Sequence, residues 1–525
     1  MKQLLICTAL LILGLNVFSQ STFQTSYGDV EIDNGKAITA ITTGGYCVVS
    51  RNGNALTDNV DIVLYNIDDD GSLLWSAKLG TNKNDYPTDI IQTPDGGFAI
   101  TGYTFGGFID STTDDIFIIK TDDQGFPLFS NTFGGPGTDE GATIMNSGDG
   151  GFYIAGSTSS YGNGLQSAFL LRTDLFGNLL WTNVNGASDS NLFSSICATR
   201  TQEILAAGSC YNPVTGDLDN YISLLDTNGS LLWAKRTGSS GDDYLNKIIT
   251  TNDGGFLSVG ASNNLSAGNF DFNVCKYDSL AGIVWSKNYG TLQYNQGTSI
   301  AICPNGDIIV TGSTNIGNNS SPLYQATILR LDSTGNLIWS NSYGDPSSDS
   351  EGEDIITGNS DAIIAIGYIK SFSDILGETH FIKTNANGNS GCYQLPLTLI
   401  TSINTFTDSI GADSQNISMI SYQINPNWQS FSNQFSLYCF NNSISNPNLN
   451  NSPMVFPNPG TGIFRIQTGI SGIQSLEIYN AIGQKVIQKT FGQDFVEVDL
   501  TNYTSGIYFF KLNNDRKGTI VLTDH

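Results

Sequence analysis

The fold is decided by residues 134–186, which read GGPGTDEGATIMNSGDGGFYIAGSTSSYGNGLQSAFLLRTDLFGNLLWTNVNG. Within them, the turn Asp149–Gly151 precedes a short apolar run, and a second apolar run covers 168–171. The turn Asp174–Gly177 then leads into a third run that contains Trp181. Short apolar runs separated by turns rich in Gly and Asp are typical of antiparallel hairpins. The stretch therefore predicts four short strands in sequence.

The same unit recurs along the chain with a period of 52 to 54 residues. Its aromatic markers are Trp75, Phe129, Trp181, Trp233, Trp285 and Trp339. A period near 50 with four strands per repeat predicts an all-β chain folded as a β-propeller. The last repeat ends near Cys392 without an aromatic fourth strand, whereas residues 22–28 match that missing strand. We therefore expect seven four-stranded blades, with the N-terminal strand closing the last blade.

The turn between strands 3 and 4 follows the pattern Asp-x-x-Gly in most repeats. The spacing from Asp278 to Gly282 predicts a turn that is one residue longer in the fifth repeat. Five repeats also place a cation two residues before this turn, at Lys120, Arg172, Lys276, Arg330 and Lys383. A ring of cations suits an anionic ligand, but we expect each to pair with a neighbouring acid, because unpaired charge is costly.

Charge and composition narrow the class of partner. The chain has 525 residues, 48 acids and 22 bases, with a net charge of −26. Such a balance argues against nucleic acid or anionic membrane surfaces as partners. Only two histidines are present, His380 and His525. This nearly excludes a histidine metal site or a Ser-His-Asp triad, and leaves carboxylate chemistry as the enzyme class still open.

The N-terminus carries the features of an export signal. Lys2 is followed by an apolar core and by small residues at Val17 and Ser19, so residues 1–19 predict a signal peptide cleaved after Ser19. No later apolar run is long enough for a transmembrane segment. Of the seven remaining cysteines, Cys392 and Cys439 bracket one segment and are the candidates for a disulfide in an oxidising compartment.

Composition divides the mature chain into four parts. Residues 20–392 are the predicted propeller, and residues 393–440 break its period but contain three predicted strands, 397–403, 417–423 and 435–440, as a β-rich extension or cap. Residues 441–453 are an Asn-rich linker with too little apolar content to fold. Residues 454–525 form a separate β-rich module, which has equal numbers of acids and bases.

Residues 454–525 carry three motifs in a fixed order. Pro457-Asn458-Pro459 comes first, the turn Tyr479–Gln484 follows, and Gly506-Ile507-Tyr508 lies in a final apolar run. This tail resembles the type A C-terminal sorting domain of the type IX secretion system of Bacteroidetes. The resemblance implies a small β-sandwich, recognised by the secretion machinery at the outer membrane and often cleaved there. It departs from the family's usual basic, apolar ending at Asp524-His525. It also implies that the protein is secreted or displayed on the outer cell surface.

The long connections lie on one face of the predicted ring. Strands 1–2 and 3–4 are joined by tight turns on the opposite face, while the connections 2→3 and 4→1 are long and dissimilar. Varied loops on a rigid scaffold are where binding sites usually lie. The acids of the 4→1 loops are the candidate binding residues on this face, although they suit solubility equally well: Asp85, Asp139, Glu140, Asp189, Asp242, Asp243, Asp349 and Glu351.

One turn resembles a cation loop. Asn66, Asp68 and Asp70 match the start of a calcium loop, but the position of its last ligand is Ala77. A solvated turn explains these residues equally well, so we predict no cofactor, with calcium as the alternative. The sequence predicts no catalytic residue. It favours a non-catalytic binding protein with a glycan or protein ligand, and the alternative is a carboxylate-dependent, glycan-active enzyme on the long-loop face.

Overall fold

The computed structural model describes residues 21–442 and 454–522, apart from gaps at 30, 55–58, 107–111, 163–164, 186–189, 264–268, 319, 371–376, 405, 411–413, 418–419, 424–426, 431–433, 457–461, 468–473, 481–483, 493–494 and 513–515. The predicted signal peptide lies outside the described residues, and so does the predicted linker apart from Asn441 and Asn442, which end a β-strand. The chain divides into two compact units, residues 1–443 and 444–525.

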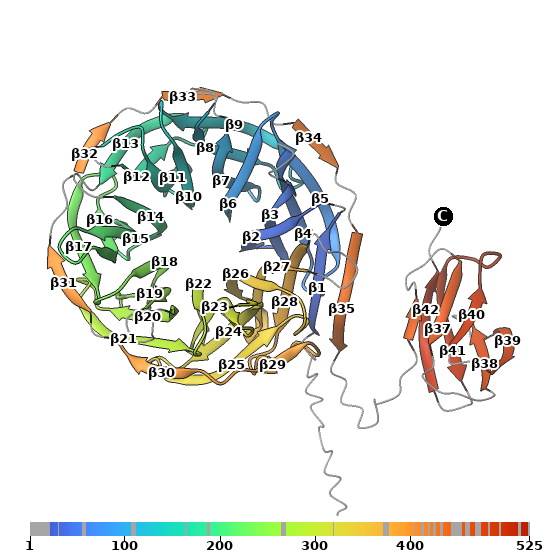
Figure 1. Cartoon of the computed structure of the whole chain (residues 1–525). Helices are drawn as coiled ribbons and strands as arrows, with labels where there is room; N and C mark the ends of the chain where they lie inside the picture. Colours follow the sequence, from blue (N-terminus) through green and yellow to red (C-terminus); the bar gives the residue numbers. More distant parts are fainter. Residues whose placement is uncertain are drawn as a thin grey trace, which may run out of the picture. The chain divides into compact units, whose positions relative to one another are not determined.

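The first unit is a β-propeller with seven blades around a central channel (Figure 1). This confirms the predicted fold. Blade 1 contains β2 (Asp33–Ala40), β3 (Tyr46–Asn54), β4 (Asn59–Ile67) and β5 (Leu73–Gly80). Blade 2 contains β6 (Asn84–Gln92), β7 (Phe98–Phe105), β8 (Asp114–Thr121) and β9 (Pro127–Gly134). Blade 3 contains β10 (Asp139–Asn146), β11 (Phe152–Thr158), β12 (Ser167–Thr173) and β13 (Leu179–Asn185). Blade 4 contains β14 (Asn191–Ala198), β15 (Ile204–Asn212), β16 (Asp217–Leu225) and β17 (Leu231–Gly238). Blade 5 contains β18 (Asp243–Thr250), β19 (Phe256–Ser262), β20 (Asp271–Tyr277) and β21 (Ile283–Gly290). Blade 6 contains β22 (Asn295–Ile302), β23 (Ile308–Asn315), β24 (Tyr324–Leu331) and β25 (Leu337–Tyr343).

Blade 7 joins the two ends of the propeller sequence. It consists of β26 (Ser350–Thr357), β27 (Ile363–Ile369), β28 (Glu378–Thr384) and β1 (Ser21–Gly28). In the β1–β28 register, Phe23 lies opposite Lys383 and Tyr27 opposite Thr379. Both aromatic side chains of β1 are fully buried. The predicted closure by the N-terminal strand is therefore confirmed.

One contact explains why the repeat keeps both an aromatic residue and a turn glycine. The ring of each fourth strand lies against the glycine of the 3–4 turn in the next blade. A Cβ placed on Gly229 would come within 2.6 Å of Trp181, and one on Gly335 within 2.9 Å of Trp285. These glycines also have φ near +80°, a conformation that disfavours other residues. The same geometry links Phe23 to Gly71 across the closing junction.

The fifth blade departs from this rule in residue type and not in length. Ala281 takes the glycine's place there with φ of 56°, and its N–H bonds to the carbonyl of Asp278 as the glycines do elsewhere. Gly282 then occupies the position after the turn, where its carbonyl accepts from the N–H of Asp278. The predicted extra residue in this turn is therefore wrong, because counting to the next Gly skipped an alanine in the left-handed conformation.

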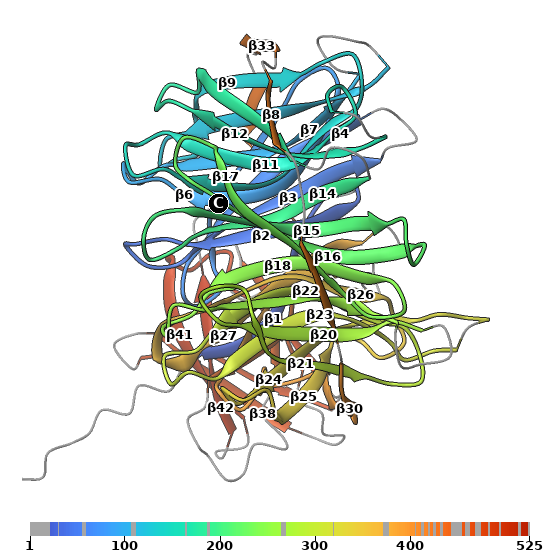
Figure 2. The same ribbon diagram turned by 90° about the vertical axis from the view of Figure 1, so that its left-hand side faces the viewer.

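Residues 394–442 encircle the propeller as a belt of seven short strands, in addition to the four strands predicted per blade. They are β29 (Gln394–Pro396), β30 (Ile400–Ile403), β31 (Thr407–Ile410), β32 (Ser414–Ile417), β33 (Ile420–Gln423), β34 (Asn427–Ser430) and β35 (Gln434–Asn442). Each pairs antiparallel with the outer strand of one blade, in the order 6, 5, 4, 3, 2, 1 and 7. Figures 1 and 2 show them on the outside of the ring, with β30 beside β21.

Three of the belt strands, β30, β33 and β35, fall in the ranges that the sequence predicts, and the other four were not predicted. The belt covers sheet edges that would otherwise attract other strands. Its last strand, β35, pairs with β1, so that the closing strand lies between two neighbours. Cys392, where the belt begins, is disulfide-bonded. Cys439 lies on β35 opposite Gln24, but its side chain is outside the described residues. The amide of Gln24 donates a hydrogen bond to the carbonyl of Cys392.

Four of the five predicted cations are engaged in ion pairs. Lys120, Lys276 and Arg330 lie 2.8 to 3.0 Å from Asp95, Asp253 and Asp307, each in the 1–2 turn of the same blade. Arg172 pairs in the same way with Asp149, and Lys383 donates to the carbonyl of Asp69. The predicted pairing with a neighbouring acid therefore holds for four of the five cations, and all five link strand 3 to a nearby turn.

The second unit consists of two small sheets. One contains β36 (Met454–Phe456), β37 (Ile463–Gln467) and β40 (Phe495–Asp499), and the other contains β39 (Lys485–Phe491), β38 (Gln474–Tyr479), β41 (Gly506–Leu512) and β42 (Arg516–Leu522). Phe464, Ile478, Val496 and Phe510, from both sheets, share one buried core. This agrees with the predicted β-sandwich.

Candidate functional site

Three of the predicted binding acids are buried at the start of the inner strands. The carboxylate of Asp85 accepts hydrogen bonds from the N–H and hydroxyl of Thr81, at 2.6 and 3.0 Å. Asp139 accepts from the N–H of Gly135, and Asp243 from that of Ser239. All three are at most 2 % exposed. Their carboxylates thus hold the 4→1 loops in shape, and burial raises the pKa of each.

The other predicted acids are more accessible. Asp242 accepts from the N–H of Leu218, and Asp349 pairs with Lys370 at 3.1 Å. Glu140 and Glu351 are half-buried at the channel mouth, and burial raises the pKa of both carboxyl groups. Asp189 lies outside the described residues. The structure therefore distributes the accessible acids over three blades, with Asp349 and Glu351 both at the start of blade 7.

The calcium candidates lie in the 3–4 turn of the first blade. The carboxylate of Asp68 accepts from the N–H groups of Asp70 and Ser72, at 2.9 and 2.7 Å, while Asp70 accepts from the hydroxyl of Ser21. Asn66 is 8 % exposed on β4. Within the described parts of the chain, no group of three or more His, Cys, Asp or Glu side chains is placed to hold a metal ion.

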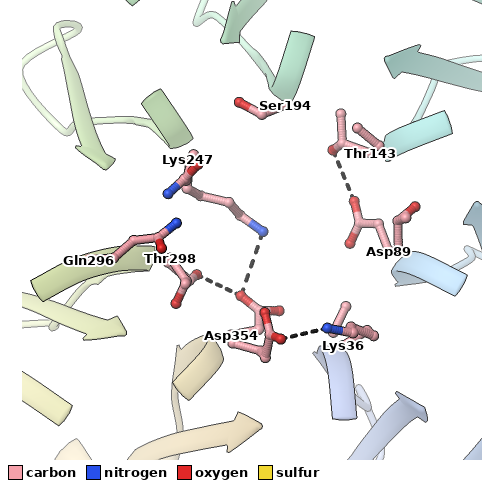
Figure 3. A pocket seen from close by; sticks show the side chains of 14 residues that line it. Lys36, Asp89, Thr143, Ser194, Lys247, Gln296, Thr298 and Asp354 are labelled. Carbon is pink, nitrogen blue, oxygen red and sulfur yellow. Dashed lines mark hydrogen bonds and ion pairs between the residues drawn. The ribbon is translucent and has the colours of Figure 1, made fainter. Parts of the chain in front are cut away.

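The channel wall is built by a feature that the sequence analysis missed. Every inner strand has a β-bulge at the same position, and the bulges turn two consecutive side chains of each blade towards the axis. The first bulge residues are Lys36, Thr88, Ala142, Ser194, Asn246, Thr298 and Glu353. A polar cavity of about 260 Å³ lies among them (Figure 3).

Most of these polar side chains connect adjacent blades. Thr88, Asn246 and Thr298 donate hydrogen bonds to the carbonyls of Gly141, Gly297 and Gly352 in the next blade, at 2.7 to 2.9 Å. Asp89 accepts from Ile144 N–H at 2.9 Å, and Asp354 accepts from Ile38 N–H at 3.1 Å. The polar wall is therefore rigid, because each hydrogen bond fixes two blades relative to one another.

Lys247 is one of the two lysines that line this cavity. Its ammonium lies 3.6 Å from Asp354, and Figure 3 shows it directed into the channel, with Asp89 also facing the interior. Asp354 raises the pKa of Lys247. The lysine therefore keeps its proton at neutral pH and acts as a hydrogen-bond donor, not as a base. At the mouth, Lys36 pairs with Glu353 at 2.5 Å.

The channel changes character along its axis. The residue after each bulge pair is an isoleucine in all seven blades: Ile38, Ile90, Ile144, Ile196, Ile248, Ile300 and Ile355. All seven are buried. Six of them line a second cavity of about 420 Å³ towards the tight-turn face. The isoleucine position is therefore apolar and uniform, although Asp89, Lys247 and Asp354 also line this second cavity.

The long-loop end is surrounded by seven half-buried residues of different kinds, which we call the mouth ring: Asn34, Tyr86, Glu140, Leu192, Tyr244, Gln296 and Glu351. They occupy the position two residues before the bulge in each blade. Tyr86 stacks on Tyr103 with 5.0 Å between centroids, and Arg51 lies over Tyr86. The same position of the seven inner strands thus carries amide, carboxyl, aliphatic and aromatic residues, of which Gln296 lines the polar cavity.

Four aromatic rings extend from the mouth ring across blades 5 and 6. Centroid distances are 5.4 Å from Tyr244 to Phe270, 5.6 Å from Phe270 to Tyr294 and 6.2 Å from Tyr294 to Tyr324. All four rings are half-buried. The hydroxyl of Tyr294 donates to Oε1 of Gln296, which lines the polar cavity. The sequence gives a partial indication of this aromatic row, because aromatic residues recur near the ends of these strands.

The described sorting motif residues lie on β41. Gly506 begins that strand, and Tyr508 is 4 % exposed, with its hydroxyl donating to the carbonyl of Thr504 at 2.7 Å. Pro457, Asn458 and Pro459 lie outside the described residues, as does the side chain of Ile507. Residues 454–522 match the family described as "Secretion system C-terminal sorting domain". The tail is a type IX secretion sorting domain.

The sorting domain implies export of the protein through the type IX system, to the cell surface or the medium. Among the described residues, no helix has the length and apolar character needed to cross a membrane. No curated protein matches the chain. One solved structure that matches is PorZ, described as an essential bacterial surface component of the type-IX secretion system of Porphyromonas gingivalis. Identity is 11 % and the TM-score 0.23, over 93 % of this chain and 81 % of that chain. That likeness is too weak to bear on function.

Proposed function

We propose that this protein is an exported binding protein, whose propeller holds a ligand at the mouth ring without transforming it. The observation that carries the proposal is the contrast between the two ends of the channel. One structural position carries isoleucine in all seven blades, while the mouth ring carries five residue types. A position that only supports packing suits one residue type, whereas a recognition surface needs several kinds of group.

Hydrogen bonds of the wall support binding rather than chemistry. Loop N–H groups donate hydrogen bonds to the carboxylates of Asp85, Asp139 and Asp243. Backbone N–H groups of adjacent blades donate to the carboxylates of Asp89 and Asp354. Lys247 is held protonated by Asp354. Groups fixed in this way provide a preorganised surface, which lowers the cost of binding.

The alternative, a glycan-active enzyme, depends on Glu140 and Glu351. Their carboxyl groups have a raised pKa, as a general acid requires. If either acted in catalysis, sugar would be released from a polysaccharide, and Glu140→Gln or Glu351→Gln would abolish the release. Binding with full recovery of the intact polysaccharide favours the binding protein instead.

The experiment uses the full mature chain incubated with cell-envelope and growth-substrate fractions of the producing bacterium. Retention is compared between the wild type, Tyr86→Ser at the mouth ring and Phe176→Ser. Phe176 is a matched aromatic control, because it is 65 % exposed in a 3–4 turn on the tight-turn face. We expect Tyr86→Ser to weaken retention and Phe176→Ser to leave it unchanged. Equal retention by both variants would contradict the proposal.

A further inference from the structure

We infer that the mouth ring binds a neutral oligosaccharide, whose sugar rings lie along the aromatic row Tyr244–Phe270–Tyr294–Tyr324 and whose end enters the polar cavity. This inference rests on the proposed function and adds its ligand class. The row and the cavity are continuous, because the hydroxyl of Tyr294 bonds to Gln296 and Gln296 lines the cavity.

The aromatic row suits sugar rings. A pyranose has an apolar C–H face and a polar edge, and tyrosine likewise combines an apolar ring with a hydroxyl. Successive centroids lie 5.4, 5.6 and 6.2 Å apart, spacings comparable with the length of one sugar unit. The rings are tilted or edge-on to one another, with interplanar angles of 51°, 63° and 87°. They therefore offer several separate contacts instead of one flat stack.

The cavity suits neutral hydroxyl groups. Asn246 and Gln296 carry amides, which both donate and accept hydrogen bonds, and Thr298 adds a hydroxyl. The charges around them are paired: Lys36 with Glu353 at 2.5 Å and Lys247 with Asp354 at 3.6 Å. A charged ligand group would have to compete with one of these pairs, whereas a sugar hydroxyl can bond to both members.

The global charge disfavours one alternative ligand and leaves another for the test. A net charge of −26 repels polyanionic glycans, because the repulsion acts over the whole surface. A cationic peptide would be attracted by the same charge, and that attraction weakens as salt screens it. Binding of a neutral oligosaccharide through ring contacts and hydrogen bonds should change little with salt. Salt dependence therefore separates the two classes.

The test measures calorimetric affinity of the full mature chain for neutral hexasaccharides of glucose, xylose, mannose and N-acetylglucosamine, and for neutral oligosaccharides prepared from the organism's own envelope. For the probe that binds, we expect Tyr294→Ser and Gln296→Leu each to weaken affinity at least about tenfold. The tight-turn control Phe176→Ser should bind like the wild type. Unchanged thermal unfolding shows that each variant is folded, and Gln296→Leu keeps the aromatic row intact if Tyr294→Ser does not fold.

Three results would overturn the inference. One is that no neutral oligosaccharide of either source binds, and another is that Tyr294→Ser and Gln296→Leu bind as tightly as the wild type. The third is that retention of the envelope fractions is lost at high salt, which indicates a cationic ligand. The proposed function is scored separately, by the retention of envelope fractions on wild type and Tyr86→Ser. A protein partner retained at the mouth ring would leave that proposal standing while the sugar assignment fails.

Discussion

The hydroxyl of Tyr27 donates a 2.7 Å hydrogen bond to the carbonyl oxygen of Gly71, which ties the first strand of the mature propeller to the 3–4 turn of the first blade. Tyr343 makes the same 2.7 Å bond to Gly388 between blades 6 and 7. The junction that closes the ring is therefore built like a junction within the continuous chain.

Removing that closure should destabilise the propeller. We expect Tyr27→Phe to cost about 1 kcal/mol of unfolding free energy, because one buried hydrogen bond is lost. Tyr343→Phe is the matched control and should cost a similar amount. A protein that starts at Gly28 loses the fully buried Phe23 and Tyr27 as well, so it should lose several times more. Urea unfolding measures all three, and an unchanged midpoint for the shortened protein would refute the closure.

The aromatic–glycine contact predicts opposite effects in two blades. Gly229→Ala forces an alanine to φ near +82° and places its Cβ 2.6 Å from Trp181, so we expect a loss of about 1–3 kcal/mol. Ala281→Gly relieves a positive φ of 56° in the equivalent turn and should stabilise by up to about 1 kcal/mol. Thermal unfolding decides the signs. Equal effects in the same direction would show that the turn glycine is not selected by this contact.

Buried acids predict that stability falls as pH rises. Burial raises the pKa of Asp33 to about 7, and those of Asp85 and Asp243 to about 6. The unfolded chain ionises these groups near pH 4, so their contribution is fully present below that pH and is lost as pH rises towards 6 to 7. Burial lowers the pKa of His380 to about 3, so this single group makes stability rise with pH. The three acids together outweigh its contribution.

We therefore expect a higher melting temperature near pH 5 than near pH 8. Asp33→Asn should reduce this difference, because the neutral amide does not titrate. Asn191 and Asn295 occupy the same position in blades 4 and 6, so the site accommodates asparagine. Scanning calorimetry at both values of pH measures the effect. A difference that is the same in Asp33→Asn and wild type would show that Asp33 is ionised in the folded protein.

The belt predicts a covalent hoop around the ring. Cys392 is disulfide-bonded, and we expect Cys439 to be its partner, since the five other described cysteines form no disulfide bond. A protease site placed between Ile417 and Ile420 would cut the belt in the full chain. The two fragments should then migrate together on a non-reducing gel and separate after reduction. If the two fragments separate without a reductant, the pairing is contradicted. It is also contradicted if the fragments of Cys439→Ser still migrate together on the non-reducing gel.

The propeller followed from the sequence because its repeats carry strong local signals. Trp181 and the turn at Asp174–Gly177 mark a contact between neighbouring blades, so they recur with the period of the fold. The missing aromatic strand and its match at Phe23 were enough to predict the closure. These features are set by residues that pack or turn in the same way in each blade.

The belt as a whole and the mouth ring could not be predicted from the sequence in this way. Strands such as β30 and β34 have four residues each and pair through backbone groups with an edge far away in sequence, so their side chains carry little pattern. The channel wall depends on bulges, which change side-chain direction, and of the mouth ring the sequence predicted only Glu140 and Glu351. For the same reason, acids such as Asp85 were predicted to face a ligand, although the structure shows that the Asp85 carboxylate caps its own loop.

The most direct test of the account, a propeller delivered by a sorting domain, is the location of two versions of the protein in the native organism. One is the full chain, and the other ends near Asn450, before the sorting domain. Because the two units have separate cores, both versions should fold. Cell fractionation with mass spectrometry should find the full chain at the surface or in the medium, without the residues beyond the linker if the tail is cleaved. The shortened protein should stay in the periplasm. Its appearance outside the cell would contradict the account.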